Sequence, residues 1–151
     1  MNKLVKFVFI FVIIFMCSAC KEHKEIRVEI SNGEVVFLLP QLPVLDTLYV
    51  EELNTQKNTF QQVWMISFES SLEDPRTVER IVYGKAPKEA KVEVMSVSRP
   101  LKDGVLYGVG MDIGPIVASG YFMVEKSGAE LKVKNLNYQE ANDFRKANLK
   151  K

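Results

Sequence analysis

The chain has 151 residues, of which 47% are hydrophobic and 26% are charged, and its formal net charge is +1. That length fits one domain with a single core, and the near-neutral charge argues against a general polyanion binder such as a nucleic-acid-binding protein. Two cysteines and one histidine leave few parts for a disulfide framework or for catalytic and zinc sites built on these residues.

The N-terminus is the most informative segment of the chain. Lys3 and Lys6 precede an unbroken apolar run over residues 7–16, and Cys17-Ser18-Ala19-Cys20 follows it. A basic start, a short apolar run and small residues are typical of a secretory signal, and the run is shorter than the roughly 20 residues that a transmembrane helix needs. We therefore expect residues 1–19 to direct export and then to be removed.

Ser18-Ala19-Cys20 resembles the bacterial lipobox, a motif in which the cysteine thiol receives lipid and a peptidase cuts just before it. The resemblance implies that Cys20 is lipidated and becomes the first residue of the mature protein. Cys17 stands where the motif usually has an aliphatic residue, and Cys17-Ser18-Ala19 also fits the site of an ordinary signal peptidase. Acyl chains add about 0.8 kcal/mol of membrane affinity per buried methylene, so an anchor of this kind would be permanent in practice.

Lys21 bears on which membrane would hold the anchor. In the enterobacterial sorting rule an aspartate at this position retains a lipoprotein in the inner membrane. By resemblance, Lys21 favours the outer membrane, facing the periplasm, over the inner membrane. Residues 20–24 are then a short lipidated tether that keeps the domain close to the bilayer.

The exported domain would hold neither a disulfide nor a free thiol, because Cys20 is its only cysteine and the sulfur carries the lipid. His23, the single histidine, lies in the polar tether and is interpreted as a solvated linker residue. A Ser-His-Asp triad, a Cys-His pair or a histidine-rich zinc site therefore lacks parts. We expect no catalytic residue, no metal site and no cofactor, and hence a protein that is not an enzyme.

From residue 25 to residue 136 the apolar residues follow a period of two, which is typical of β-strands. Asn32-Gly33 predicts a hairpin turn, because both residues tolerate positive φ. The spacing predicts an all-β sandwich or barrel of about seven to nine strands. The expected strands cover residues 26–30, 35–39, 45–50, 60–68, 78–83, 91–94, 105–111, 120–124 and 131–133.

The period changes after residue 136. Asn137 is a suitable N-cap, Glu140 stands three residues later as in a capping box, and Tyr138, Ala141 and Phe144 would share one apolar stripe. We expect residues 137–151 to form a short helix and a tail.

The segment Leu101-Lys102-Asp103-Gly104-Val105-Leu106-Tyr107-Gly108-Val109 resembles the tyrosine corner of immunoglobulin and fibronectin type III domains. The resemblance implies a sandwich of that type. It implies that the Tyr107 hydroxyl bonds back to upstream backbone while the ring packs in the core, and that Trp64 is the core tryptophan.

The pattern as a whole resembles a loose group of short bacterial envelope lipoproteins. The shared features are the lipobox, the segment over residues 28–40, Ile81-Val82-Tyr83-Gly84 and the corner over residues 101–107. Some members of that group are described as immunity proteins of type VI secretion systems. Members often carry a cysteine pair in the domain, which this chain lacks.

Gly108, Gly110 and Gly114 superficially suggest a phosphate-binding loop. Such a loop must join a strand to a helix N-terminus, which these residues do not. We interpret the glycines as marks of a bulge, an edge or a crowded crossing in a strand.

Aromatic and apolar residues outside the expected core form the candidate binding surface. Tyr49 and Tyr83 lie on strands whose opposite faces supply core residues, and we expect both to be exposed. The loop over residues 112–118 is more apolar than a loop requires. Such residues suit a protein-binding site, although a loop folded over the end of a sandwich would have the same sequence. The candidate loop residues are Ile113, Pro115, Ile116 and Val117.

We therefore expect a lipid-anchored periplasmic protein that acts by contact with a protein partner in the envelope, and no nucleic-acid partner. One alternative is an immunity protein that occludes the active site of an envelope-targeted toxin. Another is a structural accessory subunit of an envelope or secretion assembly.

Overall fold

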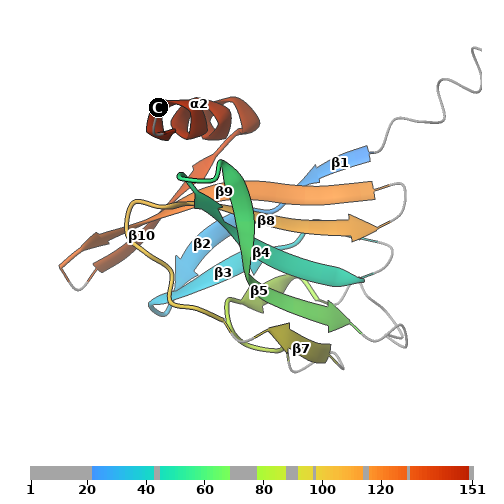
Figure 1. Ribbon diagram of the computed structural model, residues 1–151. Coiled ribbons are helices and arrows are strands. Elements are labelled where there is room, and N and C mark those ends of the chain that lie inside the picture. The colour runs from blue at the N-terminus through green and yellow to red at the C-terminus, as the bar shows by residue number, and fades with distance from the viewer. Residues whose placement is uncertain are drawn as a thin grey trace, which may run out of the picture.

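A computed structural model describes residues 22–42, 45–68, 78–87, 92–96, 98–113, 116–128 and 130–149. In this part of the chain, ten strands form two sheets, and one helix follows them (Figure 1). The larger sheet contains β1 (Glu22–Glu25), β4 (Thr47–Asn54), β5 (Thr59–Phe68), β7 (Val92–Ser96), β8 (Leu106–Ile113), β9 (Ile116–Ser127) and β10 (Glu130–Leu136). The smaller sheet contains β2 (Arg27–Ser31), β3 (Glu34–Leu38) and β6 (Arg80–Val82), and the helix α2 spans Tyr138–Asn148.

The predicted all-β, sandwich-like architecture with a C-terminal helix is confirmed. The strand order is β1-β9-β8-β4-β5-β7 in the larger sheet and β2-β3-β6 in the smaller one, and every pair but one is antiparallel. The exception is β1, which runs parallel to the first part of β9, while β10 pairs with the rest of β9 along the same edge. The nine strands expected from the sequence correspond to β2 through β10.

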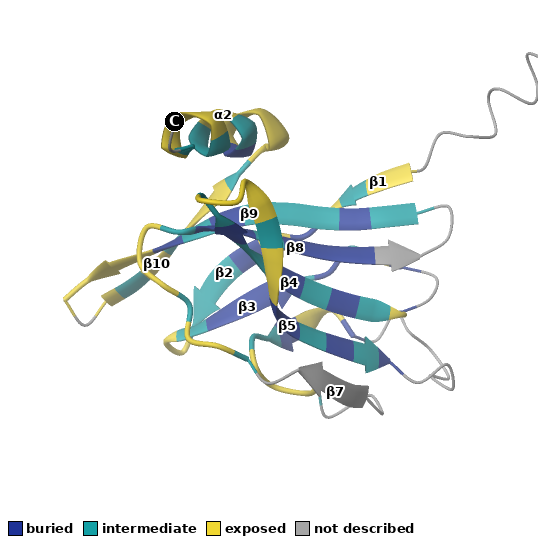
Figure 2. Cartoon of the chain, viewed as in Figure 1, coloured by how far each residue is buried: buried dark blue, intermediate teal, exposed yellow. Residues whose placement is uncertain are grey.

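The core lies between the two sheets (Figure 2). Phe37 of β3 stacks on Trp64 of β5 with ring centroids 6.2 Å apart, and its edge meets the Phe122 ring of β9 at 5.8 Å. Burying an aromatic or aliphatic side chain of this size contributes roughly 1.5–3 kcal/mol. Trp64 is therefore a core residue, as predicted.

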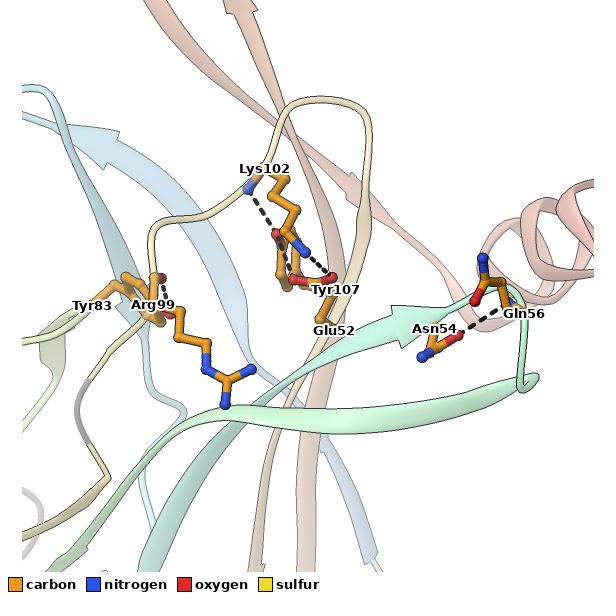
Figure 3. Close-up of polar contacts among 7 residues, drawn as sticks. All are labelled: Glu52, Asn54, Gln56, Tyr83, Arg99, Lys102 and Tyr107. Carbon is orange, nitrogen blue, oxygen red and sulfur yellow. Dashed lines mark hydrogen bonds and ion pairs between the residues drawn. The ribbon is translucent and has the colours of Figure 1, made fainter.

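Tyr107 forms the predicted corner at the start of β8 (Figure 3). Its hydroxyl oxygen accepts a hydrogen bond from the backbone N–H of Lys102 at 2.7 Å, and its buried ring stacks on Phe122 at 5.4 Å. The Lys102 ammonium donates to the Glu52 carboxylate at 2.5 Å. Gly104, with φ +68°, provides the turn between Lys102 and Tyr107.

The helix α2 packs on the outer side of the larger sheet, against β8, β9 and β10. The capping box is present, because the Asn137 side chain accepts from the Glu140 N–H at 2.9 Å and the Glu140 carboxylate accepts from the Asn137 N–H at 2.8 Å. Ala141 is buried and Phe144 packs beside it. Tyr138 departs from the predicted apolar stripe, since 72% of its surface is exposed.

The predicted tether over residues 20–24 overlaps a strand of the folded domain at its C-terminal end. Glu22 to Glu25 form β1, whose backbone pairs with Ile116–Ser119 of β9. The chain then crosses at Ile26, whose N–H donates to the Ser119 carbonyl at 2.9 Å, and enters β2 in the other sheet. Because backbone pairing does not require apolar side chains, this polar segment is ordered as an edge strand. Among the described residues, the folded part therefore begins at Glu22 instead of at residue 25.

Candidate functional site

The outer face of the larger sheet is covered by α2 over only part of its area. Side chains on this face form a cross-strand row that runs from Met65 through Tyr49, Gly110 and Ser119 to Glu25. The helix covers a neighbouring part of the face, where it packs near Leu53 and Leu106 and their partly buried neighbours Phe60, Tyr121, Met123 and Leu136. The row that contains Tyr49 therefore remains open beside the helix.

Aromatic rings lie across this face beside two glycines of β8, but they crowd only one of the two. A Cβ atom at Gly110 would come within 2.5 Å of the Tyr49 hydroxyl oxygen. At Gly108 it would be 3.7 Å from the Phe60 ring and 3.8 Å from the Tyr121 ring. A crowded crossing is confirmed at Gly110, whereas Gly108 has room for a Cβ atom and Gly114 lies outside the described residues.

A cavity of about 490 Å³ opens at the edge of this face, between β1, β9, β10 and the first turn of α2. We call it the edge cavity. Ile26, Gly120 and Leu136 supply apolar lining, and the rings of Tyr121 and Tyr138 also border it. The centroids of these two rings are 6.3 Å apart with an interplanar angle of 57°.

Most of the polar side chains that line the edge cavity have hydrogen-bond partners within the protein. His23 and Ser119 share a hydrogen bond between Nε2 and Oγ at 2.8 Å. The Asn135 amide bonds to the backbone of β2, and the Asn137 side chain caps α2. Among the residues that the structure describes, the hydroxyl groups of Tyr121 and Tyr138 have no protein partner for a hydrogen bond.

Burial shapes the electrostatics of the open face. It raises the pKa of the Tyr121 hydroxyl and the pKa of the Glu51 carboxyl, because the charged form of each group is poorly solvated there. In the described ranges Glu51 has no cationic side chain within ion-pair distance.

The Ser119–His23 contact has the spacing of a nucleophile and a general base. A triad also needs a third group that orients the imidazole, and within the described part of the chain no carboxylate is hydrogen-bonded to His23. Nor do these residues include a group of three or more His, Cys, Asp or Glu side chains that could hold a metal ion.

The structure separates the residues that the sequence suggested for binding. Tyr49 and Val117 lie on the outer face, whereas the Ile116 side chain packs against the core. Ile113 is the last residue of β8, and its side chain is not among those that the structure describes. Pro115 is outside the described residues, as is the lipidation candidate Cys20.

Tyr83 is not an exposed aromatic residue, which corrects the prediction. The strand β6 ends at Val82, so Tyr83 lies in the turn and its ring folds between the sheets. The ring meets Trp64 edge to face at 5.2 Å, and the hydroxyl donates to the Arg99 carbonyl at 2.7 Å (Figure 3). Its role is structural.

The residues that the sequence reading missed are His23, Ser119, Tyr121 and Tyr138. His23 was interpreted as a linker residue, yet it pairs with Val117 across β1 and β9. Tyr121 alternates with the core residue Phe122, and this alternation was the one available signal that it lies on the outer face.

No protein-family model, no curated protein and no solved structure matches this chain. Within the described residues, no helix has the length and apolar character needed to span a membrane.

Proposed function

We propose that this chain is a lipid-anchored protein of the bacterial cell envelope that binds a protein partner through the edge cavity and the open face beside it. The observation that carries the proposal is Tyr138, a large aromatic residue that is 72% exposed at the border of a cavity of about 490 Å³. Tyrosines beside a concave, partly apolar surface are typical of the residues that dominate binding energy at protein interfaces.

The paired polar groups of the cavity support a peptide or protein ligand. A ligand side chain that fills the cavity need not replace the His23–Ser119 bond, and it can use the two tyrosine hydroxyls at the border. Unpaired polar groups inside the cavity, beyond these two border hydroxyls, would instead have penalised an apolar side chain. An apolar or aromatic side chain of the partner therefore fits this site best.

The anchor is the second part of the proposal. Cys20 in its lipobox-like context would carry the lipid, and Lys21 would direct the protein to the outer membrane with the domain in the periplasm. We also propose that the sandwich is of the immunoglobulin or fibronectin type III kind. The corner at Tyr107, the placement of β3 between β2 and β6, and the parallel pairing of β1 with β9 support this assignment.

A photo-crosslinking amino acid at position 138, introduced into the full-length lipoprotein in cells, tests the binding site. We expect a specific crosslinked partner at position 138 and none at Ala147, an exposed position further along α2. A pull-down with Tyr138→Ala should lose that partner, and Gln139→Ala, an exposed neighbour, should retain it. Equal recovery by the two variants would remove the edge cavity from the proposal.

Catalysis is tested separately, because Ser119 and His23 are hydrogen-bonded. We expect the purified lipoprotein to hydrolyse neither ester nor peptide nor glycan substrates. Turnover that disappears in Ser119→Ala would contradict the non-enzymatic role.

A further inference from the structure

We infer that the end of the larger sheet at which β1 begins rests on the lipid headgroups of the anchoring membrane. The inference depends on the proposed anchor at Cys20 and goes beyond it, because it assigns a bilayer-facing surface to the folded domain. It also changes the role of Val117, which lies on the outer face of β9 and would lie at the membrane instead of at the partner protein.

The first step is the length of chain between the lipid and the fold. Glu22 begins β1 two residues after Cys20. Two residues span at most about 7 Å of main chain. Each headgroup layer is roughly 5–8 Å thick, since a bilayer with a hydrocarbon core of about 30 Å is 40–45 Å thick in total. A lipidated cysteine at the glycerol level therefore holds Glu22 within or just above the headgroups.

The second step is the position of the β8–β9 hairpin. Glu22 pairs with Ile116, and Ile116 pairs with Ile113 across the hairpin. Neighbouring strands lie about 4.8 Å apart, so Ile113 is within about 10 Å of Glu22. In Figure 1 the tip of β8 and the starts of β9 and β1 lie at the same end of the sheet. This end reaches the membrane with the anchor.

The third step is the contrast between the two ends of β9. At the end beside β1, Val117 is partly exposed on the outer face, whereas the neighbouring Ile116 packs against the core. At the other end, the strands that flank the β9–β10 turn carry exposed charged residues, among them Glu125, Lys126 and Lys132. Apolar side chains are stabilised at the headgroup boundary, whereas a charged turn is stabilised in water.

Charge does not drive this contact. Glu22 and Lys24 form an ion pair at 3.8 Å, so β1 contributes no basic cluster to attract anionic lipid. This end of the sheet therefore contacts the uncharged or zwitterionic lipid headgroups. Tyr121 lies five residues beyond Ile116 on β9, about 16 Å further from the headgroups along the strand. The edge cavity would then open to the side, close to the bilayer.

Single-cysteine labelling tests the inference, because the lipid blocks Cys20 in the acylated protein. Full-length lipoprotein carrying Glu22→Cys, Val117→Cys or Lys132→Cys is labelled with an environment-sensitive fluorophore and placed in phosphatidylcholine–phosphatidylethanolamine vesicles that contain nitroxide-labelled lipid. We expect several-fold stronger quenching at positions 22 and 117 than at position 132. Because Glu22 is exposed, its substitution leaves the fold intact even where Val117→Cys does not.

Equal quenching at all three positions would overturn the inference. A ten-residue Gly/Ser insertion after Lys21 should reduce quenching at position 22 to the level of position 132, and unchanged quenching would show that the short tether does not set the position. Fatty-acid labelling of wild type and Cys20→Ser separates the two proposals. If the protein is acylated but the label at position 22 is not quenched, only the contact between the domain and the headgroups is contradicted. If wild type is not acylated, the anchor itself is contradicted.

Discussion

The side-chain amide of Asn135 acts as a strand partner for the backbone of Val28. Its Oδ1 accepts from the Val28 N–H at 2.8 Å, and its Nδ2 donates to the Val28 carbonyl at 2.7 Å. Asn135 belongs to β10 of the larger sheet and Val28 to β2 of the smaller sheet. The amide therefore ties the two sheets together beside the edge cavity, near the point where the chain crosses from β1 to β2.

Replacement of Asn135 should weaken this link. In Asn135→Ala the partly buried N–H and C=O of Val28 lose their partners, which costs about 1–3 kcal/mol of unfolding free energy. Urea unfolding measures the loss, with Lys134→Ala, an exposed neighbour on β10, as the matched control. The link is not important if both variants unfold at the same urea concentration.

Two glycines on adjacent strands should respond differently to the same substitution. A Cβ atom at Gly120 would lie 2.1 Å from the Ile26 carbonyl oxygen, and backbone at the crossing cannot move aside. At Gly108 the nearest atom is an aromatic carbon at 3.7 Å, an ordinary contact. We expect Gly120→Ala to lose about 3 kcal/mol or more and Gly108→Ala less than about 1 kcal/mol. Thermal unfolding of the two variants checks the order, and similar losses would contradict the tight crossing.

Local periodicity predicted most of the fold. The Asn32-Gly33 turn has positive φ at both residues, and the segments with a period of two became strands. The exception was β1, because its residues are held by backbone pairing at an edge and leave no apolar pattern. Tyr83 was misplaced for a related reason. The turn that bends its ring inward is set by contacts with Trp64 and Arg99, which are distant in sequence from β6.

The candidate site could be predicted only in part. Tyr49 was found because it alternates with core residues on β4. The edge cavity was not found, because β1 and α2 meet on one edge of β9 although they lie at opposite ends of the folded chain. Sequence patterns report which face of a strand is buried, but they do not report which distant segments share an edge.

Stability should fall with rising pH above about 10. Burial raises the pKa of Tyr107 to about 12, and it raises that of Tyr83 to about 12 with a further contribution from Tyr107 nearby. The unfolded chain releases these protons near pH 10 while the folded chain retains them. The contribution of the two tyrosines to the unfolding free energy is therefore fully present below pH 10 and decreases towards pH 12. Each group changes the unfolding free energy by at most about 1.4 kcal/mol per pH unit in this range.

Phenylalanine variants isolate the contribution of each tyrosine. Tyr107→Phe should flatten the decrease in melting temperature between pH 10 and pH 12. At pH 7 it should also lower stability by about 1 kcal/mol, because the Lys102 N–H loses its acceptor. Tyr138→Phe, at an exposed position, is the control. Identical pH profiles for wild type and Tyr107→Phe would rule out this tyrosine as the source.

The helix α2 should depend on its cap more than on its packing. It contributes one fully buried side chain, Ala141, whereas Asn137 and Glu140 satisfy two N-terminal backbone groups. Loss of an N-cap costs about 1 kcal/mol, which is a large share of the stability of a lightly docked helix. In Asn137→Ala we expect faster hydrogen exchange over residues 138–148 and little change in the strands of the core. Gln139→Ala provides the matched control on the same turn. Because Tyr138 borders the edge cavity, partner binding should weaken together with helix protection, and binding that survives full loss of protection would mean that the helix is not part of the site.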